Sequence, residues 1–255
     1  MAYAASCDFQ LAAQREPEER LLSDRPPRGG AHAVSRGASS SRHRRVAMRR
    51  HGGPHGVPGR FGAHGNPRDF RLMLGRLEDP GRARWQRPAR LVRALGLRPG
   101  RTVAEIGAGS GYLARRVARA VGPRGRVYAV DVEPRMLAVL VQRLRRRGLT
   151  NVTPVLGRDD DPLLPARSCD VVLVVNTYHH FPGGPRYLRR LRRLLRPGGR
   201  LVNVDFHRLE TPVGPPVERR VARETFLRHA RRAGLRLSRE VTFLPYQYCL
   251  ILRSR

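Results

Sequence analysis

One acid and three glycines stand in the spacing E-x-G-x-G-x-G, at Glu105, Gly107, Gly109 and Gly111. The apolar residues around Glu105 are typical of a strand, and those from Leu113 to Val121 are typical of a helix. Glycine lacks a Cβ atom and adopts unusual backbone angles, so a ligand can contact the backbone of such a loop. A strand that enters a glycine loop and then a helix is how α/β proteins build a nucleotide pocket. The pattern therefore predicts a nucleotide-like ligand.

A second acid, Asp131, ends the strand-like run Val127–Asp131, 24 positions after Gly107. At about this interval a neighbouring strand offers an acid to the hydroxyls of a ribose. Dinucleotide-binding enzymes space their glycines G-x-G-x-x-G and rest a pyrophosphate on the helix N-terminus. The Glu105 carboxylate would repel a pyrophosphate but attract an ammonium group. The loop therefore favours S-adenosylmethionine, which carries an ammonium and a free ribose but no phosphate, and an NAD-dependent enzyme is the alternative.

Three side chains that could move a proton follow the apolar strand predicted at 171–175: Tyr178, His179 and His180. In open α/β sheets ligands bind beyond the carboxyl ends of the strands, which is where these residues fall. Because an imidazole titrates near neutral pH, either histidine could accept a proton from a phenol, an enol or a carboxylic acid. The alternative is that one histidine only packs or hydrogen-bonds within its loop. The weaker acid–base candidates are Tyr178, Asp205, His207 and Tyr246.

Further motifs follow the glycine loop in a fixed order. They are the acid Asp131, the acidic loop Gly157–Pro165, the apolar strand that ends at Asn176, and the L-x-P-G-G turn within Leu194–Val202. With the stretch E-I-G-A-G-S-G-Y, they resemble the motifs of class I S-adenosylmethionine-dependent methyltransferases, over about residues 85–255. The subgroup that the chain resembles is that of small-molecule methyltransferases similar to quinone-biosynthesis enzymes. The isoaspartyl repair methyltransferases share G-x-G-S-G-Y, but the remaining motifs match them less well.

The resemblance implies a role for each residue of the cofactor site. The three glycines give backbone approach, Glu105 holds the ammonium group directly or through water, and Asp131 accepts hydrogen bonds from both ribose hydroxyls. Asp160, or its neighbour Asp159, faces the adenine amine, and Asn176 lies beside the transferred methyl group. Methyl transfer from a sulfonium is an in-line displacement, in which the protein mainly aligns the acceptor and excludes water. A base is needed only for an acceptor that is protonated at the working pH.

The resemblance also implies a Rossmann-like α/β fold, with a seven-stranded, mostly parallel sheet, an antiparallel last strand and helices on both faces. Residues 1–60 are rich in Arg, Gly, Pro and Ser and have little apolar surface to bury, which predicts a disordered extension. Residues 61–255 are expected to form the methyltransferase domain, with N-terminal cap helices at 61–98 and the Rossmann-like core at 99–255. An alternative is that translation starts at Met48.

The C-terminal part of the chain has two predicted features. The apolar spacing from Val217 to Ala233 predicts one helix, closed by Gly234. After it, residues 235–244 and 246–252 predict a hairpin, split by Pro245, that closes the sheet.

The chain is strongly basic, with 51 Lys and Arg residues against 20 Asp and Glu residues, a net charge of +31 and no lysine. A nucleic-acid (RNA) methyltransferase that uses this charge is one reading. The other is a drift towards amino acids with GC-rich codons. Aromatic residues make up only 6% and leave few platforms for stacked bases. The apolar strand predicted at 171–175 is followed by Asn176-Thr177-Tyr178, without the N/D-P-P-Y/F motif of exocyclic amine methylation. The favoured partner is therefore a small-molecule substrate, with nucleic acid as the alternative.

Several other function classes lack support in the sequence. No apolar run approaches the roughly 18 residues of a membrane span, and the N-terminus lacks the apolar region of a signal peptide, so we expect a cytoplasmic protein. The three cysteines form neither a C-x-x-C pair nor a disulfide framework. The histidines of a His- and Gly-rich tract lack regular ligand spacing, so no metal site is expected; they are His43, His51, His55 and His64. A protein that binds the cofactor without turnover is a further alternative.

Overall fold

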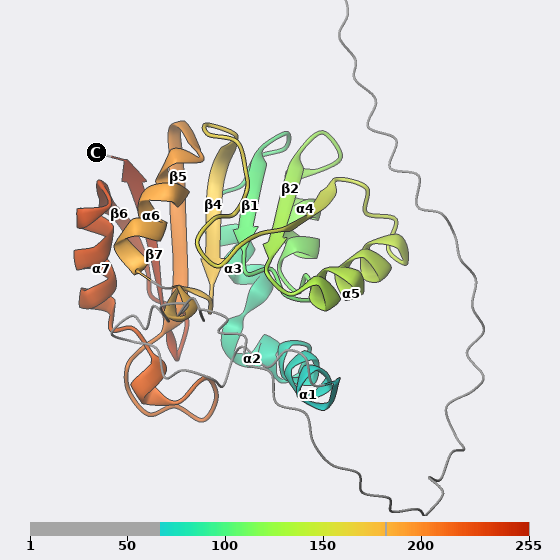
Figure 1. Cartoon of the computed structure of the whole chain (residues 1–255), viewed down its shortest axis with the longest axis horizontal. Coiled ribbons are helices and arrows are strands. Elements are labelled where there is room, and N and C mark those ends of the chain that lie inside the picture. Colours follow the sequence, from blue (N-terminus) through green and yellow to red (C-terminus); the bar gives the residue numbers. More distant parts are fainter. Residues whose placement is uncertain (1–66, 182, 255) are drawn as a thin grey trace, which may run out of the picture. The chain divides into compact units, whose positions relative to one another are not determined.

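The computed structural model describes residues 67–181 and 183–254, which belong to one compact unit. The predicted disordered extension at 1–60 and the first residues of the predicted cap region lie outside the described residues. Seven strands form one sheet in the order β3-β2-β1-β4-β5-β7-β6 (Figure 1). They are β1 (Thr102–Ile106), β2 (Arg126–Asp131), β3 (Val152–Leu156), β4 (Cys169–Val175), β5 (Leu195–Phe206), β6 (Leu235–Val241) and β7 (Gln247–Ser254).

The first five strands run parallel to one another, and β7 is inserted antiparallel between β5 and β6. A short connection around Pro245 allows β6 and β7 to pair as a hairpin, since antiparallel neighbours need no crossover helix. The predicted fold class, with its antiparallel last strand, is confirmed. Strands β1 and β4 are buried at almost every position because both faces of the sheet are covered.

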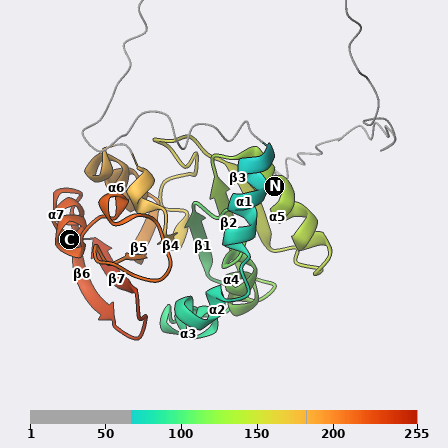
Figure 2. The ribbon, with the colours of Figure 1, turned by 90° about the horizontal axis from the view of Figure 1, so that it is seen from below.

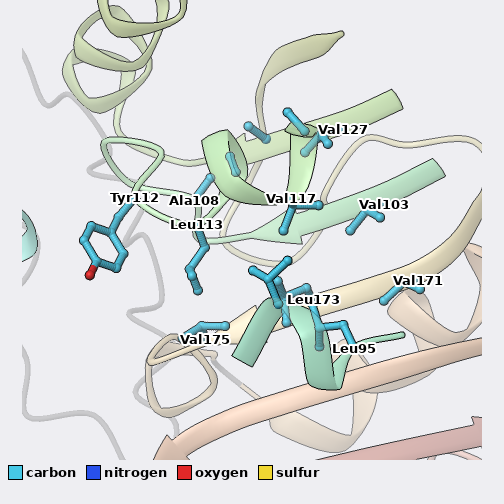
Figure 3. Close-up of a cluster of buried hydrophobic side chains, with 14 of the residues drawn as sticks. Leu95, Val103, Ala108, Tyr112, Leu113, Val117, Val127, Val171, Leu173 and Val175 are labelled. Atoms are coloured by element: carbon cyan, nitrogen blue, oxygen red, sulfur yellow. The ribbon is translucent and has the colours of Figure 1, made fainter. Parts of the chain in front are cut away.

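Helices cover the two faces of the sheet in two separate hydrophobic clusters (Figure 2). The helices are α1 (Pro67–Leu77), α2 (Arg82–Gln86), α3 (Pro88–Ala94), α4 (Ala114–Val121), α5 (Pro134–Arg145), α6 (Gly184–Arg193) and α7 (Arg223–Arg232). Side chains of α3, α4 and α5 pack on one face, where Val117 meets Val103 and Leu173 of the strands (Figure 3). Side chains of α6 and α7, such as Leu188 and Phe226, pack on the other face. The helices on both faces are therefore also confirmed.

The helix predicted from Val217 to Ala233 is wrong in its first part. The structure has a single 3-10 turn at Val217–Arg219, and α7 begins only at Arg223. Between them the buried Arg220 side chain donates hydrogen bonds to the backbone carbonyls of Pro215 (2.7 Å) and Leu209 (2.5 Å). These bonds fold the preceding loop back onto the domain and hold the chain out of the helix at this point.

The chain leaves β1 towards β2 on one side and later returns to β4 on the other side. This reversal makes the carboxyl ends of β1 and β4 the topological switch point, where open α/β sheets bind their ligands. Helices α1 and α2 lie at this end of the sheet, the lower end in Figure 1. The fold therefore leaves one crevice at the switch point, beside which the N-terminal helices stand.

Candidate active site

The glycine loop is shaped by its three positive backbone angles. Gly107, Gly109 and Gly111 have φ values of 73°, 53° and 79°, in the left-handed region that favours glycine. A Cβ atom on Gly107 would collide with the side chain of Thr177. The backbone N–H group of Gly107 donates a hydrogen bond to the carbonyl of Val130 (2.9 Å), which fastens the loop to the end of β2. The loop therefore turns sharply and packs closely, and a Cβ atom on Gly111, which does not line the cavity described below, would collide with the side chain of Leu140.

A cavity of about 640 Å³ opens at the carboxyl ends of β1, β2 and β4, within the usual size of small-molecule sites. The loop forms one wall, and Met73 and Leu77 of α1 form part of another. Of the predicted site residues, the cavity lining includes Glu105, Gly107, Gly109, Asp131, Asp159, Asn176 and His180. The fold thus brings together residues that are up to 75 positions apart in the sequence.

Glu105 is the most unusual group of the cavity. Its side chain is only 4% exposed, and its Oε2 atom has no hydrogen-bond partner among the described residues. Burial raises the pKa of the Glu105 carboxyl to about 8, although the nearby Arg82 guanidinium acts in the opposite direction. A buried carboxyl oxygen without a partner is costly, and a ligand cation would satisfy it.

Asp131 is held in place by the loop. Its Oδ2 atom accepts a hydrogen bond from the backbone N–H of Gly109 (2.7 Å), and its Oδ1 atom accepts one from the backbone N–H of Glu133 (3.0 Å). Burial raises the pKa of Asp131, and these backbone hydrogen bonds work against that rise. Each carboxylate oxygen can accept a second hydrogen bond, so the fixed carboxylate can still receive two hydroxyl groups.

Arg82 is a cavity residue that the sequence analysis missed. Its guanidinium is buried, donates to the carbonyl of Leu77 (2.7 Å) and to Gln86 (2.5 Å), and lies 4.1 Å above the ring of Tyr112. It lines the same cavity as Glu105. A cation beside an acid suits a ligand that carries both an ammonium and a carboxylate. Among 51 basic residues, no pattern in the sequence distinguishes this arginine from the rest.

The acidic loop after β3 separates its two candidates. Asp159 lies on the cavity lining together with Arg158. Asp160 does not lie there; its side chain is 58% exposed and pairs with Arg190 of α6 (3.5 Å). Asp161 pairs with the same guanidinium, so Arg190 holds the second half of this loop away from the cavity.

The residues after β4 point in different directions. His180 lines the cavity. His179 lies behind it, with its ring centroid 4.1 Å from that of His180, and its Nδ1 atom is 3.3 Å from Oδ2 of the fully buried Asp205. Tyr178 is buried in the core against Phe226, and its hydroxyl hydrogen-bonds Nδ1 of His229 (2.8 Å). The cavity therefore receives one of the three predicted acid–base candidates directly.

Asn176 lines the cavity at the end of β4, with a left-handed φ of 54°. Its Oδ1 atom accepts a hydrogen bond from Nε2 of the buried Gln247 on β7 (2.5 Å). The amide of Asn176 is therefore fixed by a neighbouring strand.

His207 and Tyr246 lie outside the cavity lining and are joined through their backbones, where the N–H of His207 donates to the carbonyl of Tyr246 (3.0 Å).

Helix α1 is fastened beside the cavity by one acid at its end, Glu78. The Glu78 carboxylate pairs with Arg115 of α4 (3.1 Å) and Arg143 of α5 (2.5 Å), and it accepts a hydrogen bond from the Ser110 hydroxyl of the glycine loop. The side chain of Leu77 lies against the loop at Gly109. The position of this helix and that of the loop are therefore linked through a single carboxylate.

The strand order, the glycine loop and the acids of the cavity define the class I methyltransferase fold. Residues 103–199 match the family model described as "Methyltransferase domain". The chain therefore contains a methyltransferase domain of the class I, S-adenosylmethionine-dependent family. Over 107 residues it is 35% identical to the ubiquinone/menaquinone biosynthesis C-methyltransferase UbiE of Bordetella parapertussis, covering 42% of this chain and 41% of that protein. Over 108 residues it is 37% identical to the nocamycin O-methyltransferase of Saccharothrix syringae, covering 42% and 36%.

The chain thus spans about two fifths of the length of these curated relatives. Among solved structures, it resembles an S-adenosylmethionine-dependent methyltransferase from Aquifex aeolicus with a TM-score of 0.68 and 26% identity, over 73% of this chain and 97% of that one. It also resembles the [4+2]-cyclase SpnF with a TM-score of 0.55 and 25% identity, over 64% and 63%.

Two further observations concern membranes and metals. No helix in residues 67–181 and 183–254 is both long and apolar enough to cross a membrane. In the same part of the chain, no group of three His, Cys, Asp or Glu side chains is arranged to hold a metal ion. The histidine tract from His43 to His64 lies outside the described residues.

Proposed function

We propose that the protein transfers a methyl group from S-adenosylmethionine to a small-molecule acceptor by in-line displacement. The observation that carries this proposal is the buried, unpartnered carboxyl oxygen of Glu105, a residue that lines the same cavity as the glycine loop. An ammonium group is the natural partner for such an oxygen. S-adenosylmethionine is a cofactor that supplies it without a phosphate.

The residues of the cavity fit the remaining parts of this cofactor. Glu105 and Arg82 would hold the ammonium and carboxylate of the methionine part, since the two side chains line one cavity with opposite charge types. Asp131 would accept hydrogen bonds from the ribose hydroxyls. Asp159 would face the adenine amine, because Asp160 pairs with Arg190 and does not line the cavity. Asn176 would lie beside the sulfonium, with its amide oriented by Gln247.

When bound, the cofactor supplies an electrophilic methyl group with a good leaving group. The protein then has to align the acceptor and exclude water, and proximity alone can supply several kcal/mol. Met73 and Leu77 of α1 and Phe181 after β4 contribute apolar walls to the cavity. These walls would keep water from the reacting groups.

His180 is our candidate for the group that takes a proton from the acceptor. It lines the cavity, and its ring contacts that of His179 with an angle of 43° between the ring planes. His179 would act as a positioning residue, since Asp205 holds its ring in place from below. Tyr178 would be structural, because its hydroxyl hydrogen-bonds His229 within the core. A base with this placement suits a phenol, an enol or a similar weak acid.

The relatives are named for methylation at carbon and at oxygen, which supports an aromatic or quinone-like acceptor with an acidic hydroxyl. NAD is a poorer fit, because a diphosphate would leave the buried Oε2 atom of Glu105 without a partner, and the acid Asp159 in the same cavity would repel it. A nucleic-acid acceptor is a separate outcome of the test below.

The test uses S-adenosylmethionine labelled in its methyl group. The full-length protein is incubated with it and with either a small-molecule extract or the RNA and DNA of cells that lack the gene, and Asp131→Asn serves as the control. We expect label in one or a few extract compounds, dependent on Asp131. Label in nucleic acid alone, or no label in either fraction, would contradict the proposal.

A further inference from the structure

A second hollow region lies at the other end of the sheet, the upper end in Figure 1, where β7 ends. It consists of two cavities of about 320 and 440 Å³ that share Arg253 and the residues Pro197–Gly199, an irregular segment of β5 where its pairing with β4 shifts register. We call it the arginine groove. Its lining includes seven arginines, namely Arg98, Arg101, Arg167, Arg196, Arg200, Arg236 and Arg253. Asp170 is the only acid among its lining residues.

The positive charge of the arginine groove is largely uncompensated. Asp170 pairs with Arg101 (2.7 Å) and with Arg196 (3.1 Å), so one carboxylate serves two guanidinium groups. Burial lowers the pKa of Arg200, and the like charges of Arg253 and Arg101 lower it further. The groove therefore carries a concentrated positive field that attracts anions.

Three of its arginines are available to a ligand. Arg98, Arg167 and Arg236 are exposed, and their guanidinium groups form no ion pair within the part of the chain that the structure describes. They come from three separate segments: the connection before β1, the connection before β4, and the edge strand β6. A basic composition alone would spread positive charge over the whole surface. Here three segments that are distant in sequence place their arginines in the same groove.

Two glycines of β5, Gly198 and Gly199, lie in the part of the groove that both cavities share. Gly198 has a φ of 74°, and no atom lies within 4 Å of the position that a Cβ atom would take. The neighbouring Gly199 is packed against the backbone carbonyls of Arg196 and Asp170. This segment of β5 is thus held in place at Gly199 and open to solvent at Gly198, which lets an anion approach its backbone.

We propose that the arginine groove binds the phosphate backbone of a nucleic acid, independently of the methyl-transfer site. Arg98, Arg167 and Arg236 come from three separate segments and have no ion-pair partner among the described residues, so a chain of phosphates fits better than a single anion. The lining contains no aromatic side chain to stack on a base, so the recognition is of charge and not of sequence. The exposed large apolar side chains of the described residues all lie outside the lining, which disfavours a membrane surface.

The test compares two triple variants of the full-length protein by fluorescence anisotropy with a short labelled RNA of mixed sequence. The groove variant is Arg98→Gln, Arg167→Gln and Arg236→Gln. The control removes the same charge from helix ends, by Arg145→Gln, Arg146→Gln and Arg231→Gln, at exposed positions. The arginine-rich residues 1–66 are present in every variant and contribute equally. Thermal unfolding verifies that both variants are folded.

We expect the groove variant to bind RNA about tenfold or more weakly, with the control within about twofold of wild type. The slope of log K against log salt, between about 50 and 200 mM, should be shallower by about 2 in the groove variant, because each lost phosphate contact on a single strand removes about 0.7. Tripolyphosphate should compete with RNA. Equal weakening in both variants would overturn the proposal, as would tighter binding to phosphatidylserine vesicles than to RNA, or binding of tripolyphosphate without RNA binding.

Discussion

The substitution Glu105→Gln isolates the energetic cost that this site imposes on the protein without its ligand. Burial raises the pKa of the Glu105 carboxyl from 4.5 to about 8, and the side chain is only 4% exposed. Each pKa unit corresponds to about 1.4 kcal/mol, so ionising this carboxyl in the folded protein costs about 5 kcal/mol. This is comparable with the whole stability of many domains.

The sign follows from proton binding. Between pH 4.5 and about 8 the folded protein keeps the Glu105 proton and the unfolded chain does not, so the free energy of unfolding falls as the pH rises. The stabilisation by the protonated form is complete below pH 4.5 and is lost as the pH passes through 8. Glutamine has the same shape and does not ionise. Between about pH 5 and pH 9, wild type should therefore lose about 4 kcal/mol relative to Glu105→Gln.

The assay is chemical denaturation of both proteins, without cofactor, across this pH range. Every other titrating group is present in both proteins, so the difference between their free energies of unfolding reports Glu105 alone. A constant offset between the two curves would reflect packing of the amide. A difference that does not change with pH would refute the placement of Glu105 as a buried carboxyl that ionises only at high pH.

Four further substitutions test other parts of the site. Asp131→Asn should weaken S-adenosylmethionine binding at least about tenfold in calorimetry, because an amide is a poorer acceptor for ribose hydroxyls; unchanged affinity would remove the ribose assignment. His180→Gln should lower kcat about 100-fold with little change in cofactor affinity. Tyr178→Phe should keep kcat and cost about 1 kcal/mol of stability. A large loss of kcat in Tyr178→Phe with an unchanged kcat in His180→Gln would make Tyr178, and not His180, the proton acceptor. Gly107→Ala should destabilise the protein more than Gly148→Ala, which has a similar φ and no neighbour within 4 Å, as thermal unfolding would show; equal losses would exclude the Thr177 contact.

The positions of individual strands and the cofactor loop could be predicted because their signals are local. The apolar run at β4 and the glycines of one loop are recognisable without knowledge of distant contacts, whereas the seven-stranded sheet with its antiparallel last strand was expected only from the family resemblance. The first part of the helix predicted over 217–233 was wrong, because the buried Arg220 satisfies loop carbonyls more than ten residues away. Apolar spacing carries no information about such a side chain.

The parts of the site that depend on packing were not predictable. Sequence left Asp159 and Asp160 as alternatives, and only the contact of Asp160 with Arg190 of α6 separates their surroundings. The two histidines after β4 are adjacent in sequence, yet one lines the cavity and the other lies against Asp205. Arg82 joins the cavity through the placement of α2 beside β1, a long-range contact with no local pattern.

Titration calorimetry with S-adenosylmethionine, in two buffers of different ionisation enthalpy at pH 7, tests the central claim most directly. Because the pKa of Glu105 is about 8, the carboxyl is mostly protonated at this pH and must ionise to pair with an ammonium group. We predict one binding site, release of about one proton on binding, no release in Glu105→Gln, and no binding of NAD. Binding of NAD in place of S-adenosylmethionine, or the same proton release in Glu105→Gln, would contradict the account.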